Sequence, residues 1–248
     1  MRTLFFIDSL PEADLITVSG DEANHALKVL RLGVGDEITL SDGNGKWAHC
    51  RINSTTKRDF LAGVLESGEE EVNKPKLKVV QAIPKSDRWR EMVELLVESG
   101  VDEILPWNSA RGIAKSQSDT KSKWEVAAFA AAKQSRRYFI PKISEPINLN
   151  NFIKDLPENK KEQIIFVMHE SADAKLSTVF KNIFDSVKLE DVSEILIVIG
   201  PEGGITDQEL SDLKVAGGHV VKLGRPVYRS AHAASAALAA ISALIGRW

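Results

Sequence analysis

The sequence predicts an α/β protein in which a mainly parallel sheet with helices on both faces follows a small β-rich domain. Two observations carry this prediction. Beyond about residue 76, short apolar runs alternate with amphipathic segments of helical period, which is typical of strand–helix repeats. Before about residue 70, the runs are short, rich in β-branched and aromatic residues, and separated by turn residues.

The composition is that of an ordinary globular chain: 248 residues, 43% hydrophobic, 27% charged, with a net charge of −3. The single cysteine, Cys50, excludes an intramolecular disulfide, and the five histidines lack metal-ligand spacing, so no metal is expected. The first residues do not resemble a signal peptide, and no apolar run reaches membrane-spanning length. We therefore expect a cytoplasmic protein that uses no membrane.

The N-terminal segment predicts a small barrel of short strands. A helix over 21–31 interrupts them, and Asp-Gly-Asn-Gly at 42–45 predicts a hairpin turn. The strands are expected at residues 4–8, 16–19, 36–43, 46–53 and 60–67. A polar, proline-terminated segment at 69–75 marks the boundary, which gives domains 1–72 and 73–248.

The second domain predicts strands and helices in alternation. Strands are expected at 77–83, 101–107, 164–170, 194–200 and 219–224, and helices at 86–99, 121–136, 175–185, 206–215 and 230–244. Thr206 and Glu209 have the spacing of a capping box. The last helix is apolar nearly all round, so it must be buried in the core or against a partner.

Three loops follow predicted strands, and ligands in parallel sheets bind at the carboxyl ends of strands. Ile-Gly-Pro-Glu-Gly-Gly at 199–204 matches neither GxGxxG nor a P-loop, and a plain turn is the alternative reading. Leu-Gly-Arg-Pro-Val-Tyr-Arg-Ser at 223–230 places Arg229 at a helix start, where the dipole disfavours a cation unless an anion is near. The alternative for Arg229 is a solvated side chain, and His169 in the third loop is either catalytic or a structural hydrogen-bonder.

These loops resemble a known signature. Ile-Gly-Pro-Glu-Gly-Gly followed by Leu-Gly-x-x-Val-x-Arg is similar to the cofactor-binding motif of the SPOUT methyltransferases. Further positions resemble one family within that class, the bacterial 16S ribosomal RNA uracil-N3 methyltransferases, which act at position 1498. They are Lys85-Ser86-Asp87-Arg88, Gly100-Val101, Pro106, Arg111, Gln134, Arg137, Pro141, His25, Val29-Leu30-Arg31 and Gly35-Asp36.

The resemblance implies a PUA-like β-barrel for RNA binding, then a SPOUT domain with a C-terminal trefoil knot. It implies a homodimer that uses S-adenosylmethionine to methylate 16S rRNA. The expected substrate is this rRNA in the assembled small ribosomal subunit. The residues expected to bind the cofactor are Met168, His169, Ile199, Gly200, Pro201, Glu202, Gly203, Gly204, Leu223, Gly224, Val227, Tyr228 and Ser230. Those expected to bind RNA are Arg2, His25, Lys28, Arg31, Lys85, Arg88, Arg111 and Arg137.

Arg229 is the expected catalytic residue, because a guanidinium can stabilise charge that develops on the uracil oxygens. The chain departs from the family at Arg225-Pro226, where the order is usually reversed, and at Ala231-His232, where Glu-Thr is usual. Three other functions remain open. They are a SPOUT methyltransferase for ribose 2′-hydroxyls or transfer RNA, a non-catalytic RNA-binding ribosome-assembly factor, and a small-molecule α/β enzyme.

Overall fold

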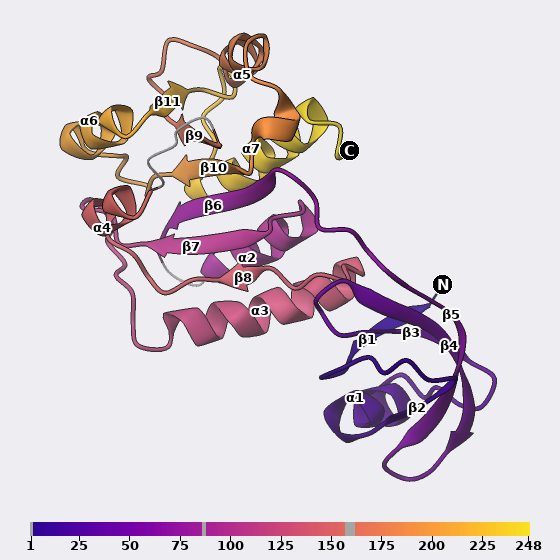
Figure 1. Ribbon diagram of the computed structural model, residues 1–248. Coiled ribbons are helices and arrows are strands. Elements are labelled where there is room, and N and C mark those ends of the chain that lie inside the picture. Colours follow the sequence, from indigo (N-terminus) through magenta and orange to yellow (C-terminus); the bar gives the residue numbers. More distant parts are fainter. Residues whose placement is uncertain (1, 86–87, 157–161) are drawn as a thin grey trace. The chain divides into compact units, whose positions relative to one another are not determined.

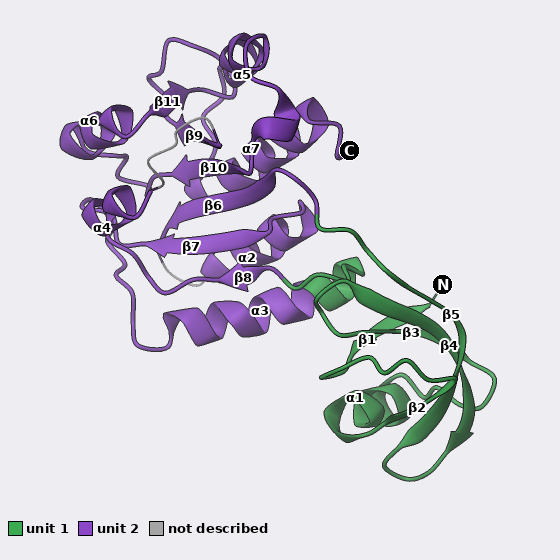
Figure 2. Ribbon diagram, viewed as in Figure 1, with its two compact units in different colours: residues 1–72, 132–140 green, residues 73–131, 141–248 purple. Residues whose placement is uncertain are grey.

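The computed structural model describes residues 2–85, 88–156 and 162–248 (Figure 1). The chain divides into two compact units (Figure 2). The first contains the chain up to residue 72 together with residues 132–140, and the second contains 73–131 and 141–248. The predicted helix start at Ser86 and Asp87 lies outside the described residues.

The first unit is a five-stranded sheet in the order β1-β3-β4-β5-β2. Its strands are β1 Thr3–Phe6, β2 Leu15–Val18, β3 Glu37–Ser41, β4 Lys46–Thr55 and β5 Phe60–Glu69, which confirms each predicted strand. All neighbours are antiparallel except β1 and β3. The sheet closes over a core that includes Phe5, Ile38, Leu40 and Phe60. No pairing joins β1 to β2 among the described residues, so the barrel is open along these edges.

The predicted helix over 21–31 is present as a helix over residues 20–29, but its second half is π-helical. An α-helix, α1 Gly20–Asn24, passes into the π-helical turn η1 His25–Val29, where the Leu30 N–H donates to the His25 carbonyl at 3.0 Å. The chain then turns through Arg31, whose φ of 56° lies in the left-handed region. A tertiary contact accompanies this turn: the Lys133 amine lies 3.1 Å from His25 Nδ1.

The hairpin turn at 42–45 joins β3 to β4 as predicted, and residues 138–140 pack on it. Gly45 N–H donates to the Tyr138 carbonyl, and Ile140 N–H donates to the Gly43 carbonyl at 2.9 Å. A Cβ on Gly43 would lie 2.6 Å from Ile140 Cδ1, so this close approach requires glycine as well as its φ of 73°. These contacts are the reason that 132–140 cluster with the first unit.

The second unit is built on a six-stranded, wholly parallel sheet in the order β11-β9-β10-β6-β7-β8, as the alternation of apolar runs predicts. The strands are β6 Lys76–Ala82, β7 Glu103–Trp107, β8 Lys142–Ile143, β9 Gln163–Met168, β10 Glu194–Ile199 and β11 Gly218–Val221. The helices are α2 Arg88–Glu98, α3 Thr120–Ser135, α4 Leu149–Lys154, α5 Leu176–Phe184, α6 Asp207–Val215 and α7 Ser230–Leu244, with the 3-10 turn η2 Leu189–Asp191. The last turn of α3 belongs to the first unit.

Helices cover both faces of this sheet (Figure 1). On one face, Val80, Val167 and Val198 pack with residues of α4 and α6. On the other face, α7 contacts β6 and β10 and packs against α2. The α7 side chains Ala234, Leu238 and Ile241 are fully buried, as expected for an apolar helix, whereas Leu244 is 44% exposed. No described helix is long and apolar enough to span a membrane.

The register of the sheet positions the loops. Ile199, the last residue of β10, is paired with Gln81 on β6 and with Met168 on β9. Because these strands are parallel and end at the same level, the segments that begin at Gly200 and His169 leave the sheet side by side. Sequence patterns missed three short elements of this unit, β8, α4 and η2.

Candidate functional site

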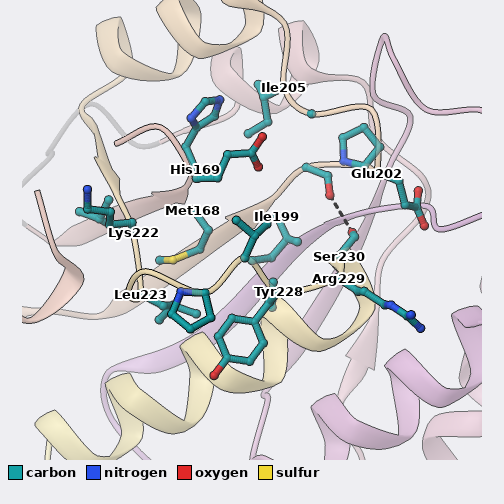
Figure 3. A pocket seen from close by; sticks show the side chains of 18 of the residues that line it. Met168, His169, Ile199, Glu202, Ile205, Lys222, Leu223, Tyr228, Arg229 and Ser230 are labelled. Atoms are coloured by element: carbon teal, nitrogen blue, oxygen red, sulfur yellow. Dashed lines mark hydrogen bonds between the residues drawn. The ribbon is translucent and has the colours of Figure 1, made fainter. Parts of the chain in front are cut away.

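Three loops at the carboxyl ends of β9, β10 and β11 surround one cavity of about 530 Å³, within the second unit (Figure 3). The two segments at 199–204 and 223–230 therefore share a single pocket, as the sequence predicts. The expected residues that line it are Met168, His169, Ile199, Gly200, Pro201, Glu202, Gly204, Leu223, Gly224, Val227, Tyr228, Arg229 and Ser230, together with Arg88.

The glycine-rich segment is a tight turn packed on a buried isoleucine. Gly204 N–H donates to the Pro201 carbonyl at 2.9 Å, and Gly204 has a φ of 76°, which favours glycine. A Cβ on Gly200 would lie 2.6 Å from Ile205 Cγ1, so no larger residue fits without a shift. The segment can thus bring its backbone close to a ligand while its other side rests on the core.

The turn leads into α6 through the predicted capping box, which is confirmed between Thr206 and Glu209. Glu209 is 8% exposed, and each of its two carboxylate oxygens accepts a backbone hydrogen bond. One oxygen accepts from the Thr206 N–H at 2.9 Å, and the other accepts from the Ala110 N–H at 2.7 Å. The loop after β7 is therefore fastened to the start of α6, a link that the sequence pattern does not report.

The segment before α7 ends on Arg229, the N-cap, whose side chain makes no capping hydrogen bond. The Arg229 side chain lies on the same side of the pocket as that of Glu202 (Figure 3). The next residue, Ser230, is 8% exposed, and its Oγ donates to the Gly200 carbonyl at 2.7 Å. This bond joins the two loops that the sequence predicts to form one pocket.

The loop after β9 is held to β11 by the His169 N–H, which donates to the Val221 carbonyl at 2.9 Å. His169 Nδ1 accepts from the Ser171 N–H at 3.2 Å. Because Nδ1 accepts, a neutral His169 carries its proton on Nε2. The side chain therefore has a structural hydrogen bond of its own and also lines the pocket.

Six lining residues were not predicted: Glu170, Ile205, Val221, Lys222, Pro226 and Ala233. Four of them adjoin predicted residues in sequence, so widening each loop by one residue finds them, and Val221 lies one residue further on. Ala233 lies one helical turn after Ser230, and that spacing is a signal for it once α7 is known to begin at the pocket.

Gly203, expected in the pocket, does not line it. A Cβ there would lie 3.2 Å from the Arg111 carbonyl oxygen, so Gly203 faces the turn after β7 instead. The Arg111 guanidinium in turn reaches the Gly203 carbonyl at 3.5 Å. The side of the glycine-rich turn that faces away from the pocket therefore packs closely against the backbone at Arg111.

The expected RNA-binding set is divided between the two units, and three of its members belong to the second unit. Arg88 lines the pocket, the Lys85 N–H donates to the Glu202 carboxylate at 3.4 Å, and Arg111 contacts Gly203. The remaining five lie in the first unit: Arg2, His25, Lys28, Arg31 and Arg137. Of these, Arg2 is paired with the Glu37 carboxylate at 2.9 Å.

The positions that depart from the family pattern lie around the start of α7. Arg225 is exposed and does not line the cavity, whereas Pro226 does. Ala231 is 3% exposed, and His232 Nε2 lies 3.4 Å from a Glu91 carboxylate oxygen on α2. Among the described residues, no group of three or more histidine, cysteine or acidic side chains could hold a metal ion.

Comparison with known proteins gives the same two-part organisation. A family model described as an RNA methyltransferase domain matches residues 71–242, and one described as an RNA methyltransferase PUA domain matches residues 18–65. The chain is similar to the "Ribosomal RNA small subunit methyltransferase E" of Mycobacterium bovis, with 33% identity over 99% of this chain and 93% of that protein. The protein of the same name from Bacillus subtilis is 29% identical over 94% and 91% of the two chains.

A solved structure agrees with these matches. The ribosomal RNA small subunit methyltransferase E of Neisseria gonorrhoeae, crystallised with S-adenosyl methionine, superposes with a TM-score of 0.84 at 26% identity, over 98% of both chains. The expected fold, an α/β RNA methyltransferase domain with a parallel sheet behind a PUA-like domain, is confirmed, and the C-terminal knot stays an expectation. The chain belongs to the ribosomal RNA small subunit methyltransferase E family of RNA methyltransferases.

Proposed function

We propose that this protein methylates N3 of a uridine of 16S rRNA, at position 1498, with S-adenosylmethionine as the methyl donor. The observation that carries the proposal is the single pocket lined by the two motif segments, whose walls meet at the Ser230–Gly200 hydrogen bond. The assignment of lining residues to the cofactor and of Arg229 to catalysis is part of this proposal.

The pocket suits the donor chemically. Its volume of about 530 Å³ falls in the range of ligand sites. Ile199, Ile205 and Leu223 give apolar surface for a nucleoside, and Glu170 and Glu202 give negative charge for a cationic sulfonium and amine. When bound, S-adenosylmethionine supplies an electrophilic methyl group, so no metal is needed for activation.

The residues of the chain must then handle a nucleobase that carries a proton on N3. We infer that the base is bound out of its stack at the mouth of the pocket, beside Arg229 and Arg88. The Arg229 guanidinium stabilises the negative charge that grows on the uracil oxygens as N3 loses its proton.

The substrate is RNA in the small ribosomal subunit, within the cytoplasm, and the protein acts as a homodimer. The support for a dimer is the exposed apolar surface at the ends of the α7 region, where Val227 is 71%, Tyr228 49% and Trp248 66% exposed. An extended RNA contact would also use the expected RNA-binding residues of the first unit: Arg2, His25, Lys28, Arg31 and Arg137. Sedimentation velocity at micromolar protein tests the dimer, and a monomer under these conditions refutes it.

The decisive experiment is methyl transfer from labelled donor to small subunits that lack the modification, followed by mapping of the methylated nucleotide. N3-methyluridine at a single site supports the proposal. A 2′-O-methyl product or a transfer RNA product identifies a different SPOUT activity. Donor binding without transfer to any RNA identifies a binding factor. Transfer that does not need RNA identifies a small-molecule enzyme.

A further inference from the structure

A glutamine lies fully buried at the carboxyl end of the central strand β6. Gln81 is 0% exposed and is paired in register with Ile199 on β10 and with Pro106 on β7. It is thus beside the last residue before the glycine-rich turn, yet it does not line the pocket. Buried polar side chains are retained where their hydrogen bonds are needed, so its contacts are informative.

The Gln81 amide directs a one-way chain of hydrogen bonds. Its Nε2 donates to the Ser230 hydroxyl at 3.1 Å and to the Ala82 carbonyl at 2.9 Å. An amide nitrogen can only donate, so the Ser230 oxygen accepts and its single proton points to the Gly200 carbonyl. Exchanging the amide oxygen and nitrogen would set two oxygens against each other at Ala82, which fixes this orientation.

These hydrogen bonds therefore join three segments that are far apart in the sequence. Gln81 belongs to β6, Gly200 opens the glycine-rich turn, and Ser230 is the first residue of α7. Gly200 and Ser230 both line the pocket, from its two motif segments. Without the donor at Gln81, the Ser230 hydroxyl is free to rotate away from Gly200, and the two walls lose the bond that fixes their spacing.

The other end of the same amide is unsatisfied. Gln81 Oε1 is buried and has no hydrogen-bond partner among the described residues. A buried acceptor without a partner destabilises a fold. Replacing Gln81 by leucine, which is of similar size, removes this unpaired oxygen and at the same time removes the Nε2 donor to Ser230. If Gln81 served only stability, an apolar replacement would be a natural choice.

We propose that Gln81 is a positioning residue for the cofactor pocket: it orients the Ser230 hydroxyl toward Gly200 and so holds the glycine-rich turn and the start of α7 at the spacing that binds the donor. This rests on the proposed function, since it takes the pocket to be the S-adenosylmethionine site. Gln81 touches no reacting group; it acts through Ser230.

The test is calorimetric titration of S-adenosylmethionine into the full-length wild type and into Gln81→Leu. We expect the Kd of the variant to rise about 5- to 10-fold, the effect of one hydrogen bond. The melting temperature should stay within about 3 °C of the wild type, because a lost bond and a removed orphan oxygen offset each other. The KM for RNA should not change.

Two further variants separate positioning from general damage. An ionised carboxylate in Gln81→Glu cannot donate and would instead accept the Ser230 proton, which would then no longer point to Gly200. This variant should therefore weaken binding at least as much as the leucine variant. Gln163→Leu is the matched control, since Gln163 bonds to Glu194 at the opposite end of the sheet.

The double-mutant cycle decides the matter. In a Ser230→Ala background, Gln81→Leu should have no additional effect on the Kd, because the hydroxyl through which it acts is gone. An undiminished effect in that background, or a Kd in Gln81→Leu equal to that of the wild type, overturns the inference. A wild type that does not bind the donor at millimolar concentration refutes the proposed function instead.

Discussion

Replacing Gly200 by alanine tests the packing behind the cofactor loop. The new Cβ would lie 2.6 Å from Ile205 Cγ1 and 3.4 Å from the Ile205 nitrogen. Carbon atoms pack at about 3.5–4.0 Å, so the Cγ1 contact is short by about 1 Å. Ile205 is 4% exposed, belongs to the core between the sheet and α6, and also lines the pocket, so its side chain could shift only into the pocket.

The loop rather than the core should therefore move. Overpacking of this kind costs about 1–3 kcal/mol. If binding of S-adenosylmethionine requires the original loop position, the same free energy appears as a loss of affinity of about 5- to 150-fold. A shift of Gly200 also breaks the bond that its carbonyl accepts from Ser230, which places the expected value in the upper part of that range.

The assay is calorimetry of donor binding alongside a thermal melt. Gly33→Ala is the matched control outside the pocket, because a Cβ there would meet nothing within 4 Å. A second substitution, Ile205→Ala, removes the clashing atom and should restore part of the affinity lost by Gly200→Ala. Unchanged affinity and melting temperature in Gly200→Ala, with no coupling to Ile205, would refute this account of the loop.

Three other perturbations have defined outcomes. The Arg247 side chain is 11% exposed, and its guanidinium lies 3.1 Å from the Asp102 carboxylate. Arg247→Ala removes this interaction and should lower the free energy of unfolding, measured by urea titration, by about 2–3 kcal/mol. A loss under about 0.5 kcal/mol contradicts this expectation. Burial raises the pKa of Glu103, but hydrogen bonds from Ser144 and a lysine, with a second lysine nearby, outweigh it and leave the pKa below its ordinary value. This stabilisation is present above the ordinary glutamate pKa of about 4.3 and is lost as pH falls through the depressed folded-state value, so Glu103→Gln should flatten the acid side of the stability profile; an unaltered acid limb counts against this. Burial raises the pKa of the Cys50 thiol to about 11, so iodoacetamide at pH 8 should label it only after unfolding, and rapid labelling of the native protein would be inconsistent with the fold.

Much of the second unit follows from local sequence. Short, β-branched apolar runs such as Ile-Leu-Ile-Val-Ile at 195–199 favour strands buried on both faces, and the capping box at Thr206 marks the start of a helix. Because parallel strands end at one edge, the placement of three loops around one pocket also follows from the order of elements. The strands of the first unit also follow from local sequence, since the alternation of apolar and polar residues and the turn residues between the strands predict them.

Other features escape such patterns for physical reasons. β8 has two residues and α4 has six, too few to show a period. The π-turn at His25 differs from an α-helix by one residue in its bonding, which leaves the side-chain pattern almost unchanged. The knot is an expectation from family resemblance alone, because periodicity carries no information on threading.

What the sequence alone determined is the type of each long element and the chemistry of the loops: glycine at 200, 203 and 204, a serine at 230, an arginine before it. The tertiary structure decided which of these meet. Gly203 packs against Arg111 rather than the cavity, residues 132–140 join the first unit, and Gln81 donates to a hydroxyl 149 residues away. Local patterns reflect the backbone preferences of neighbours in the chain, whereas these contacts arise from hydrogen bonds and close packing between segments that only the folded sheet brings together.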